Sequence, residues 1–95
     1  MPTPHISNDQ KLSQLARDRN NLLKRQERQW VVFDVRMNYR ADEARIDGTL
    51  EIENIVSKCH EAGYLLYKID NYAVPAMAGP RVHLLLIFRA QELHV

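Results

Sequence analysis

The chain has little of what disulfide-rich, zinc-binding or low-complexity proteins contain. Its 95 residues include one cysteine, three glycines and four prolines. A single cysteine cannot form an internal disulfide and offers no cysteine pair to a zinc ion. The longest strongly apolar run, LLLIF at 84–88, is too short to span a bilayer. The opening MPTPHISNDQ has no apolar segment of a secretory signal, so we expect a cytoplasmic protein.

The overall composition is that of a folded globular protein. Hydrophobic residues make up 45% of the chain and charged residues 26%, which excludes wholesale disorder. The length allows one hydrophobic core, so we expect a single domain at 8–95 after a flexible tail at 1–7 that holds two prolines. Because so short a chain buries a modest share of its surface, a homodimer would be a reasonable source of added stability.

Two segments have the apolar spacing of helices. From about residue 7 to residue 28, leucines recur at intervals of three, four and seven, and Ser7 or Asn8 can supply the cap. The second segment, 49–62, carries a regular apolar stripe that includes Cys59. Asp47 or Thr49 is a candidate cap for this second helix, and Gly63 is a suitable left-handed stop.

Three segments have the pattern of strands. Residues 30–40 alternate apolar and polar side chains, 64–72 alternate less strictly, and 81–90 are apolar on both faces in the middle. YRADEARIDG at 39–48 is expected to be a charged connection, either irregular or with a short turn of helix. The stretch at 74–80, with two prolines and a glycine, is not expected to be regular sheet. The order predicts an α+β fold, in which an N-terminal helix precedes a split β-α-β-β unit. Its three-stranded sheet, of order 1-3-2, is covered by the helix at 49–62.

One helix leaves the other face of this sheet to be covered. That face would carry apolar side chains, among them Trp30, Val32 and Leu66, beside charged ones. Either the N-terminal helix folds over the face, or the face meets a second copy or another protein. The expected protein interface comprises Leu12, Leu15, Leu22, Trp30, Val32 and Tyr72.

Charge is distributed unevenly along the chain. Residues 1–28 hold six basic and three acidic side chains, whereas 41–63 hold six acidic and two basic ones. An alternative function is therefore nucleic-acid binding by the basic residues of the first helix, Arg17, Arg19, Lys24, Arg25 and Arg28. A further alternative is an acidic docking surface for a basic partner, formed by Asp42, Glu43, Asp47, Glu51 and Glu53. Mixed charge is also what an ordinary solvated helix face carries.

No catalytic, metal or cofactor site is expected. Cys59 falls on the apolar stripe of its helix and His60 points elsewhere, so a reactive thiolate–imidazole pair is not predicted. The four histidines lack metal-ligand spacing, and there is no glycine-rich phosphate loop. We therefore expect a non-enzymatic, dimeric protein-interaction module that occludes a surface of another macromolecule. Small phage or mobile-element inhibitors, including anti-CRISPR proteins, are often of this size and similarly lack catalytic residues.

Overall fold

The computed structural model describes residues 6–40, 45–75, 77 and 81–91. The described residues form three helices and four strands. In chain order these are α1 (Asn8–Arg17), α2 (Leu22–Glu27), β1 (Trp30–Arg40), β2 (Arg45–Asp47), α3 (Thr49–Glu61), β3 (Tyr64–Val74) and β4 (Arg81–Ala90). The predicted α+β class is confirmed.

The sheet differs from the prediction in the number of its strands. It has four strands in the order β2-β1-β4-β3, and every neighbouring pair is antiparallel. The fourth strand is the short β2, which pairs with the far end of β1. It lies in the charged connection at 39–48, for which we predicted no strand. Three residues are too few for a period-two pattern to be recognised, so only pairing with β1 identifies this strand.

The N-terminal helical segment is two helices instead of one. Ser7 caps α1 with a full capping box, because its hydroxyl accepts from the Gln10 amide and the Gln10 side chain accepts from the Ser7 amide. The helix ends at Arg17, and Asn21 then caps α2 by accepting from the Lys24 amide. Asparagine side chains favour caps and turns over helix interiors, which explains the break.

Glycines set the two ends of α3. Gly48, with φ of 105°, is the N-cap in place of the expected Asp47 or Thr49. The Met37 side chain packs closely against the position that a Cβ would occupy at Gly48. A Cβ at Gly48 would lie 2.9 Å from the Arg36 carbonyl oxygen, and other residues rarely adopt this positive φ, so any substitution would be strained. At the other end Gly63, with φ of 88°, is the left-handed stop, as predicted.

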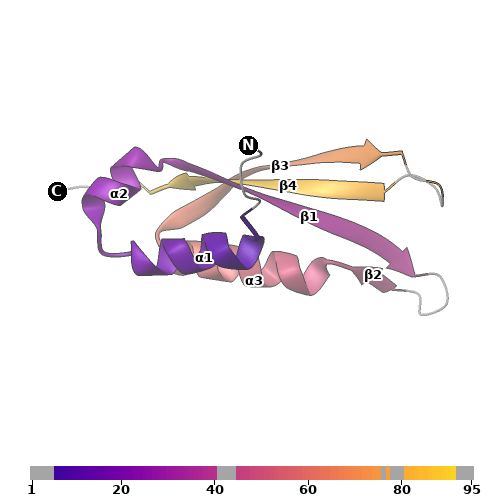
Figure 1. Ribbon diagram of the computed structural model, residues 1–95, viewed down its shortest axis with the longest axis horizontal. Helices are drawn as coiled ribbons and strands as arrows, with labels where there is room; N and C mark the ends of the chain where they lie inside the picture. The colour runs from indigo at the N-terminus through magenta and orange to yellow at the C-terminus, as the bar shows by residue number, and fades with distance from the viewer. Residues whose placement is uncertain (1–5, 41–44, 76, 78–80, 92–95) are drawn as a thin grey trace.

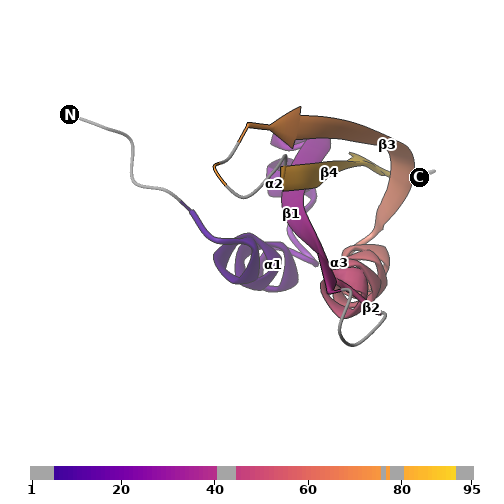
Figure 2. The ribbon, with the colours of Figure 1, turned by 90° about the vertical axis from the view of Figure 1, so that its right-hand side faces the viewer.

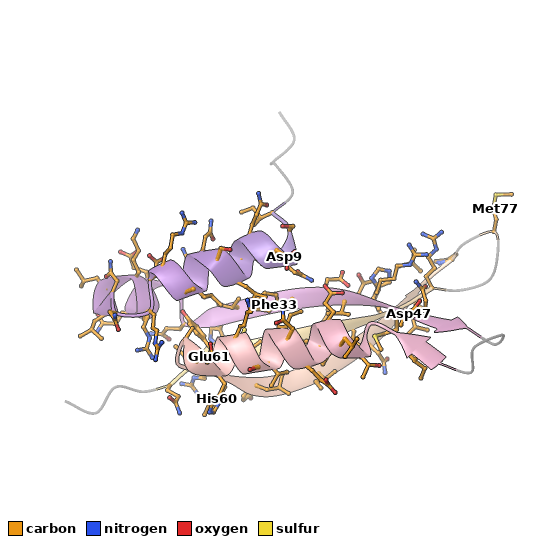
Figure 3. The ribbon with its side chains drawn as sticks, turned by 90° about the horizontal axis from the view of Figure 1, so that it is seen from below. Asp9, Phe33, Asp47, His60, Glu61 and Met77 are labelled. Atoms are coloured by element: carbon orange, nitrogen blue, oxygen red, sulfur yellow. The ribbon has the colours of Figure 1, made fainter. Side chains whose placement is uncertain are left out.

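Both long helices pack on the same face of the sheet, where the core lies. Figure 1 shows α1 and α3 on one side of the strands, and Figure 3 views them side by side from that side, with Phe33 between them. The fully buried side chains come from β1, β4 and α3: Phe33, Val35, Ile55, Cys59, Leu86 and Phe88. Leu12 and Leu15 of α1 complete this core. The N-terminal helix therefore does not cover the second face of the sheet.

Helix α1 also protects one edge of the sheet. Figure 2 shows it next to β1 and away from β3. Lys11 Nζ donates to the carbonyl of Val32, and Asn8 Nδ2 donates to the carbonyl of Asp34, each at 2.9 Å. Backbone carbonyls at a strand edge need such partners, and side chains of α1 supply them here.

Candidate functional site

The candidate site is the sheet face turned away from the helices, which we call the outer face. Alternate residues of the three long strands point to it, since their neighbours in sequence point into the core. On β1 and β4 the outer face carries Trp30, Val32, Asp34, Arg36, His83, Leu85, Ile87 and Arg89. On β3 it carries Leu65, Tyr67, Lys68, Asp70, Tyr72 and Val74.

A β-bulge in β3 decides which of its residues belong to this face. The pairing with β4 shifts between Leu66 and Lys68, so that Tyr67 is the extra residue. Leu66 pairs with the buried Phe88 and thus belongs to the helix-covered face, which corrects its predicted position. In its place the bulge turns Tyr67 outward, where its ring meets Trp30.

The outer face exposes several large apolar side chains. Trp30 is 48% exposed, Val32 40% and Tyr67 64%. Among the described residues, no helix or strand lies over them. Solvent-exposed apolar groups gathered on one face are typical of surfaces that bind other macromolecules.

An aromatic cluster occupies one end of the outer face. The rings of Trp30 and Tyr67 meet edge to face, with centroids 5.1 Å apart. The guanidinium of Arg89 lies 5.5 Å from the centroid of the Trp30 ring, a cation–π geometry. Tryptophan, tyrosine and arginine are the residues that most often dominate the energetics of protein interfaces. This end therefore has the composition of an interface anchor.

A polar cluster lies toward the other end. The Asp34 carboxylate accepts a hydrogen bond from the Tyr72 hydroxyl, and its second oxygen lies 2.8 Å from Nδ1 of His83. The rings of Tyr72 and His83 stack with centroids 4.9 Å apart. Because an ionised carboxylate only accepts, Nδ1 of His83 carries the proton, which leaves Nε2 for other partners. Three strands thus contribute one side chain each to a single cluster.

The cluster shifts the ionisation of two of its members. Partial burial acts to raise the pKa of Asp34, but the hydrogen bonds from Tyr72 and His83, with the positive charge of Lys11, outweigh it and lower that pKa. The hydrogen bond to Asp34 raises the pKa of Tyr72 above its ordinary value, with smaller effects of burial and of the Asp34 charge in the same direction. At neutral pH Asp34 is therefore an anion held by two donors.

This arrangement predicts a stability difference that depends on pH. The pKa of Asp34 is lower in the folded chain than its ordinary value of 3.8. The stabilisation that ionised Asp34 gives the fold is therefore fully present above pH 3.8 and is lost as the pH falls through the lowered pKa. Tyr72→Phe removes one donor. We expect it to destabilise the fold slightly at pH 7, because solvent screens an exposed pair, and to have less effect at an acidic pH well below 3.8.

Urea unfolding followed by the fluorescence of Trp30 at both pH values measures this difference. Tyr67→Phe is the matched control, because it removes a hydroxyl from the same strand for which the described residues offer no hydrogen-bond partner. Equal losses of stability for the two variants at pH 7, or a Tyr72→Phe loss that persists unchanged in acid, would contradict the role given to Asp34.

A shallow groove of about 440 Å³ runs beside the polar cluster. Asp34, Arg36 and His83 line it together with the start of α1 and with Glu51 of α3. These groups can donate and accept hydrogen bonds. The alternation of strand 30–40 and strand 81–90 placed Asp34 and His83 outward, but nothing in the sequence indicated that they meet Tyr72.

The predicted interface residues fall into two groups. Leu12 and Leu15 are buried in the core of their own chain, so they form no part of the exposed surface and that prediction is corrected. Trp30, Val32 and Tyr72 all lie exposed on the outer face, whereas Leu22 is exposed on α2. The structure therefore brings three of the six residues together.

The basic residues of the predicted nucleic-acid surface are partly engaged within the chain. Arg25 donates to the carbonyl of Gly63, and Arg28 pairs with Asp18 at 3.4 Å. Lys24 lies 3.9 Å from Glu27. Arg17 and Arg19 have no ion pair with another described residue. A phosphate backbone would thus compete with existing partners for three of the five side chains.

The predicted acidic docking surface is divided as well. Asp42 and Glu43 lie outside the described residues. Asp47 has a partner within the chain, and Glu51 accepts a hydrogen bond from Asn8 at 3.0 Å. Glu53 is exposed on α3.

Cys59 is a core residue, as its place on the apolar stripe predicted. It is fully buried, and this burial raises the pKa of its thiol to about 12. The thiol is therefore protonated at neutral pH and is not a nucleophile. His60, the next residue, is exposed.

Comparisons with known proteins identify no relative of this chain. No family model matches it, and neither the search of curated proteins nor that of solved structures finds a match. Across the described ranges, no group of three or more histidine, cysteine, aspartate or glutamate side chains is arranged to hold a metal ion. None of the three helices has the length and apolar character needed to cross a membrane. The class defined by the fold is an α+β domain with one open sheet face.

Proposed function

We propose that this protein is a non-enzymatic interaction module that acts as a dimer in the cytoplasm and occludes a surface of another protein. The observation that carries the proposal is the outer face, which no described helix or strand covers. Both long helices pack on the opposite side, while Trp30, Val32 and Tyr67 remain exposed on this one. An inhibitor that works by covering a functional surface of its target needs such a face and no catalytic group.

The aromatic cluster gives the proposed interface its centre. Trp30 already packs against Tyr67 and Arg89, so its ring is held in place before any partner arrives. A side chain that is fixed in advance loses less conformational entropy on binding. The surrounding charges, among them Arg36, Lys68 and Asp70, form the polar rim that is usual around an interface core.

Trp30→Ala is expected to abolish most of the binding without unfolding the chain. Truncation of an interface hot spot costs about 2 kcal/mol or more, which is roughly a 30-fold loss of affinity. The partner is first captured from a lysate of the source cells with the tagged wild-type protein, with and without nuclease, and identified by mass spectrometry. Its affinity for each variant is then measured by titration.

Leu50→Ala is the control, since Leu50 is 81% exposed on α3 and lies away from the outer face. The proposal predicts that this variant binds like the wild type. If both variants bind the captured protein as tightly as the wild type, the outer face is not the interface. If the retained material disappears after nuclease treatment, the protein binds nucleic acid instead, and Arg17 and Arg19 become the first residues to test.

A further inference from the structure

The two edges of the sheet differ in what covers them. The edge of β1 is covered by α1 and extended by β2. Strand β3 forms the opposite edge, and within the described ranges no other strand pairs with its outer side. It is also one of the two longest strands, with 11 residues. A long edge strand without cover is a template for pairing with another strand.

Strand β3 also carries exposed apolar side chains along this edge. Leu65 is 42% exposed on the outer face, while Leu66 at 40% and Ile69 at 49% are exposed on the helix-covered face. The helices therefore do not reach the apolar side chains along this edge. A strand added beside β3 would shield such groups on both faces at once.

The charged side chains of β3 are complementary to those of a second, antiparallel copy of the same strand. Lys68 Nζ lies 3.3 Å from Asp70 Oδ1, and both side chains point to the outer face with about half of their surface exposed. A lysine on an edge strand ordinarily discourages pairing. Here an aspartate two residues away offsets its charge, so the middle of the edge carries one positive and one negative group that flank Ile69.

We propose that β3 pairs antiparallel with β3 of a second copy of this chain, about a two-fold axis that passes beside Ile69. In this register Lys68 of each copy faces Asp70 of the other, and the two Ile69 side chains meet. A shift of the axis to Lys68 or to Asp70 would place like charges opposite each other, which is unfavourable. The inference rests on the dimer of the proposed function and specifies its interface.

The bulge determines the pairs farther from the axis. Because Tyr67 and Lys68 both point to the outer face, Tyr67 stays outside the ladder and the pairing beyond it moves by one residue. Leu65 then faces Tyr72 of the second copy, so two exposed side chains of the outer face cover each other. Tyr67 keeps its contact with Trp30.

The dimer formed in this way has a single sheet of eight strands, four from each copy. A two-fold axis perpendicular to the sheet keeps the helices of both copies on one side. It also joins the two outer faces into one continuous surface on the other side. The pairing therefore doubles the surface proposed for target binding and does not cover Trp30.

Two charge reversals test this register. Lys68→Asp places only acidic groups in the middle of the paired strands, and Asp70→Lys places only basic ones. Each variant alone should dimerise about tenfold more weakly than the wild type, because two cross-strand pairs change from attraction to repulsion. An equimolar mixture of the two variants should form a heterodimer with about the affinity of the wild type, since every acid then faces a lysine. Sedimentation velocity over a concentration series measures all three constants.

The double variant Lys68→Asp/Asp70→Lys provides an independent measurement. It keeps the ion pair between positions 68 and 70 within each chain, and in a dimer of two double-variant chains every acid still faces a lysine. It should therefore dimerise with itself like the wild type. It should form mixed dimers with the wild type poorly, because like charges then face each other. Lys58→Asp, a reversal on the exposed surface of α3, is the control that should leave dimerisation unchanged. Thermal unfolding of each variant verifies that it is folded.

Each result has a separate meaning. A wild type that stays monomeric at all concentrations would overturn both this interface and the dimeric part of the proposed function, but not the binding role of Trp30. If the wild type dimerises and the single reversals do not weaken it, or if their mixture does not restore the dimer, the dimer survives and this interface is wrong.

Discussion

Phe33→Ala is expected to leave the protein largely unfolded at physiological temperature. The Phe33 side chain is fully buried under α1 and α3, and its ring meets that of Phe88 edge to face with centroids 5.7 Å apart. Removal of a buried phenylalanine costs about 3–5 kcal/mol, through lost burial and the cavity that remains. For a domain of this size that is much of the total stability, and the melting temperature should fall by more than about 12 °C.

The neighbouring residue supplies the control for this variant. Val32 lies on the same strand but on the outer face, where 40% of its side chain is exposed. Val32→Ala should change the free energy of unfolding by about 1 kcal/mol or less. Thermal unfolding followed by circular dichroism compares the two variants. Similar losses for both would show that the helices do not define the buried side of β1.

Leu15→Ala is expected to have the second largest effect, and on stability more than on binding. Leu15 is 4% exposed and packs with Leu12 in the core shared by α1, α3 and the sheet. The loss of a buried leucine side chain costs about 2–5 kcal/mol. Each of the two helices has two buried residues, but α3 is three residues longer and also packs the partly buried Ile52 and Val56 against the core. Helix α1 should therefore detach from the sheet more readily than α3. Urea unfolding of the purified chain measures the cost.

Leu23→Ala is the matched control, since Leu23 is 72% exposed on α2. It should change stability by no more than about 0.5 kcal/mol. The comparison separates two roles for the N-terminal leucines. If Leu15→Ala left the unfolding transition in place but weakened partner binding, then Leu15 would be an interface residue, as its sequence pattern first suggested.

The features that the sequence predicted correctly depend on residues close together in the chain. The strand at 30–40 has an uninterrupted period of two, and the helix at 49–61 has a continuous apolar stripe with a glycine after its end. Ser7 was one of two candidates for the first cap, and the capping box selects it. The burial of Cys59 likewise followed from its helical position.

The failures at β2 and at Gly48 originate in contacts between distant segments, whereas the break between α1 and α2 is a local competition. The break between α1 and α2 depends on Asn21, whose preference for caps competes with a leucine pattern that continues past it. The β2 strand exists only because β1 offers it an edge. The Gly48 cap could not be anticipated, because the backbone carbonyl that approaches it, that of Arg36, comes from β1.

The candidate site shows the same division. Most of its members could be assigned to outward strand positions from their alternation alone. Leu65, Leu66 and Tyr67 were each assigned to the wrong face, because no local pattern marks the bulge. That Asp34, Tyr72 and His83 form one cluster follows from the strand order, which brings residues 38 and 49 positions away from Asp34 to its carboxylate.

The sequence by itself therefore determined the α+β class, the long strands, the helix at 49–61 and the apolar character of the outer face. Only the tertiary structure decided that none of the described helices covers this face. The leucines of α1 suit either side of a sheet equally well, because hydrophobic burial has no direction. The choice was made by contacts with other segments: Lys11 and Asn8 reach the carbonyls at the edge of β1, and Leu12 and Leu15 share a core with α3.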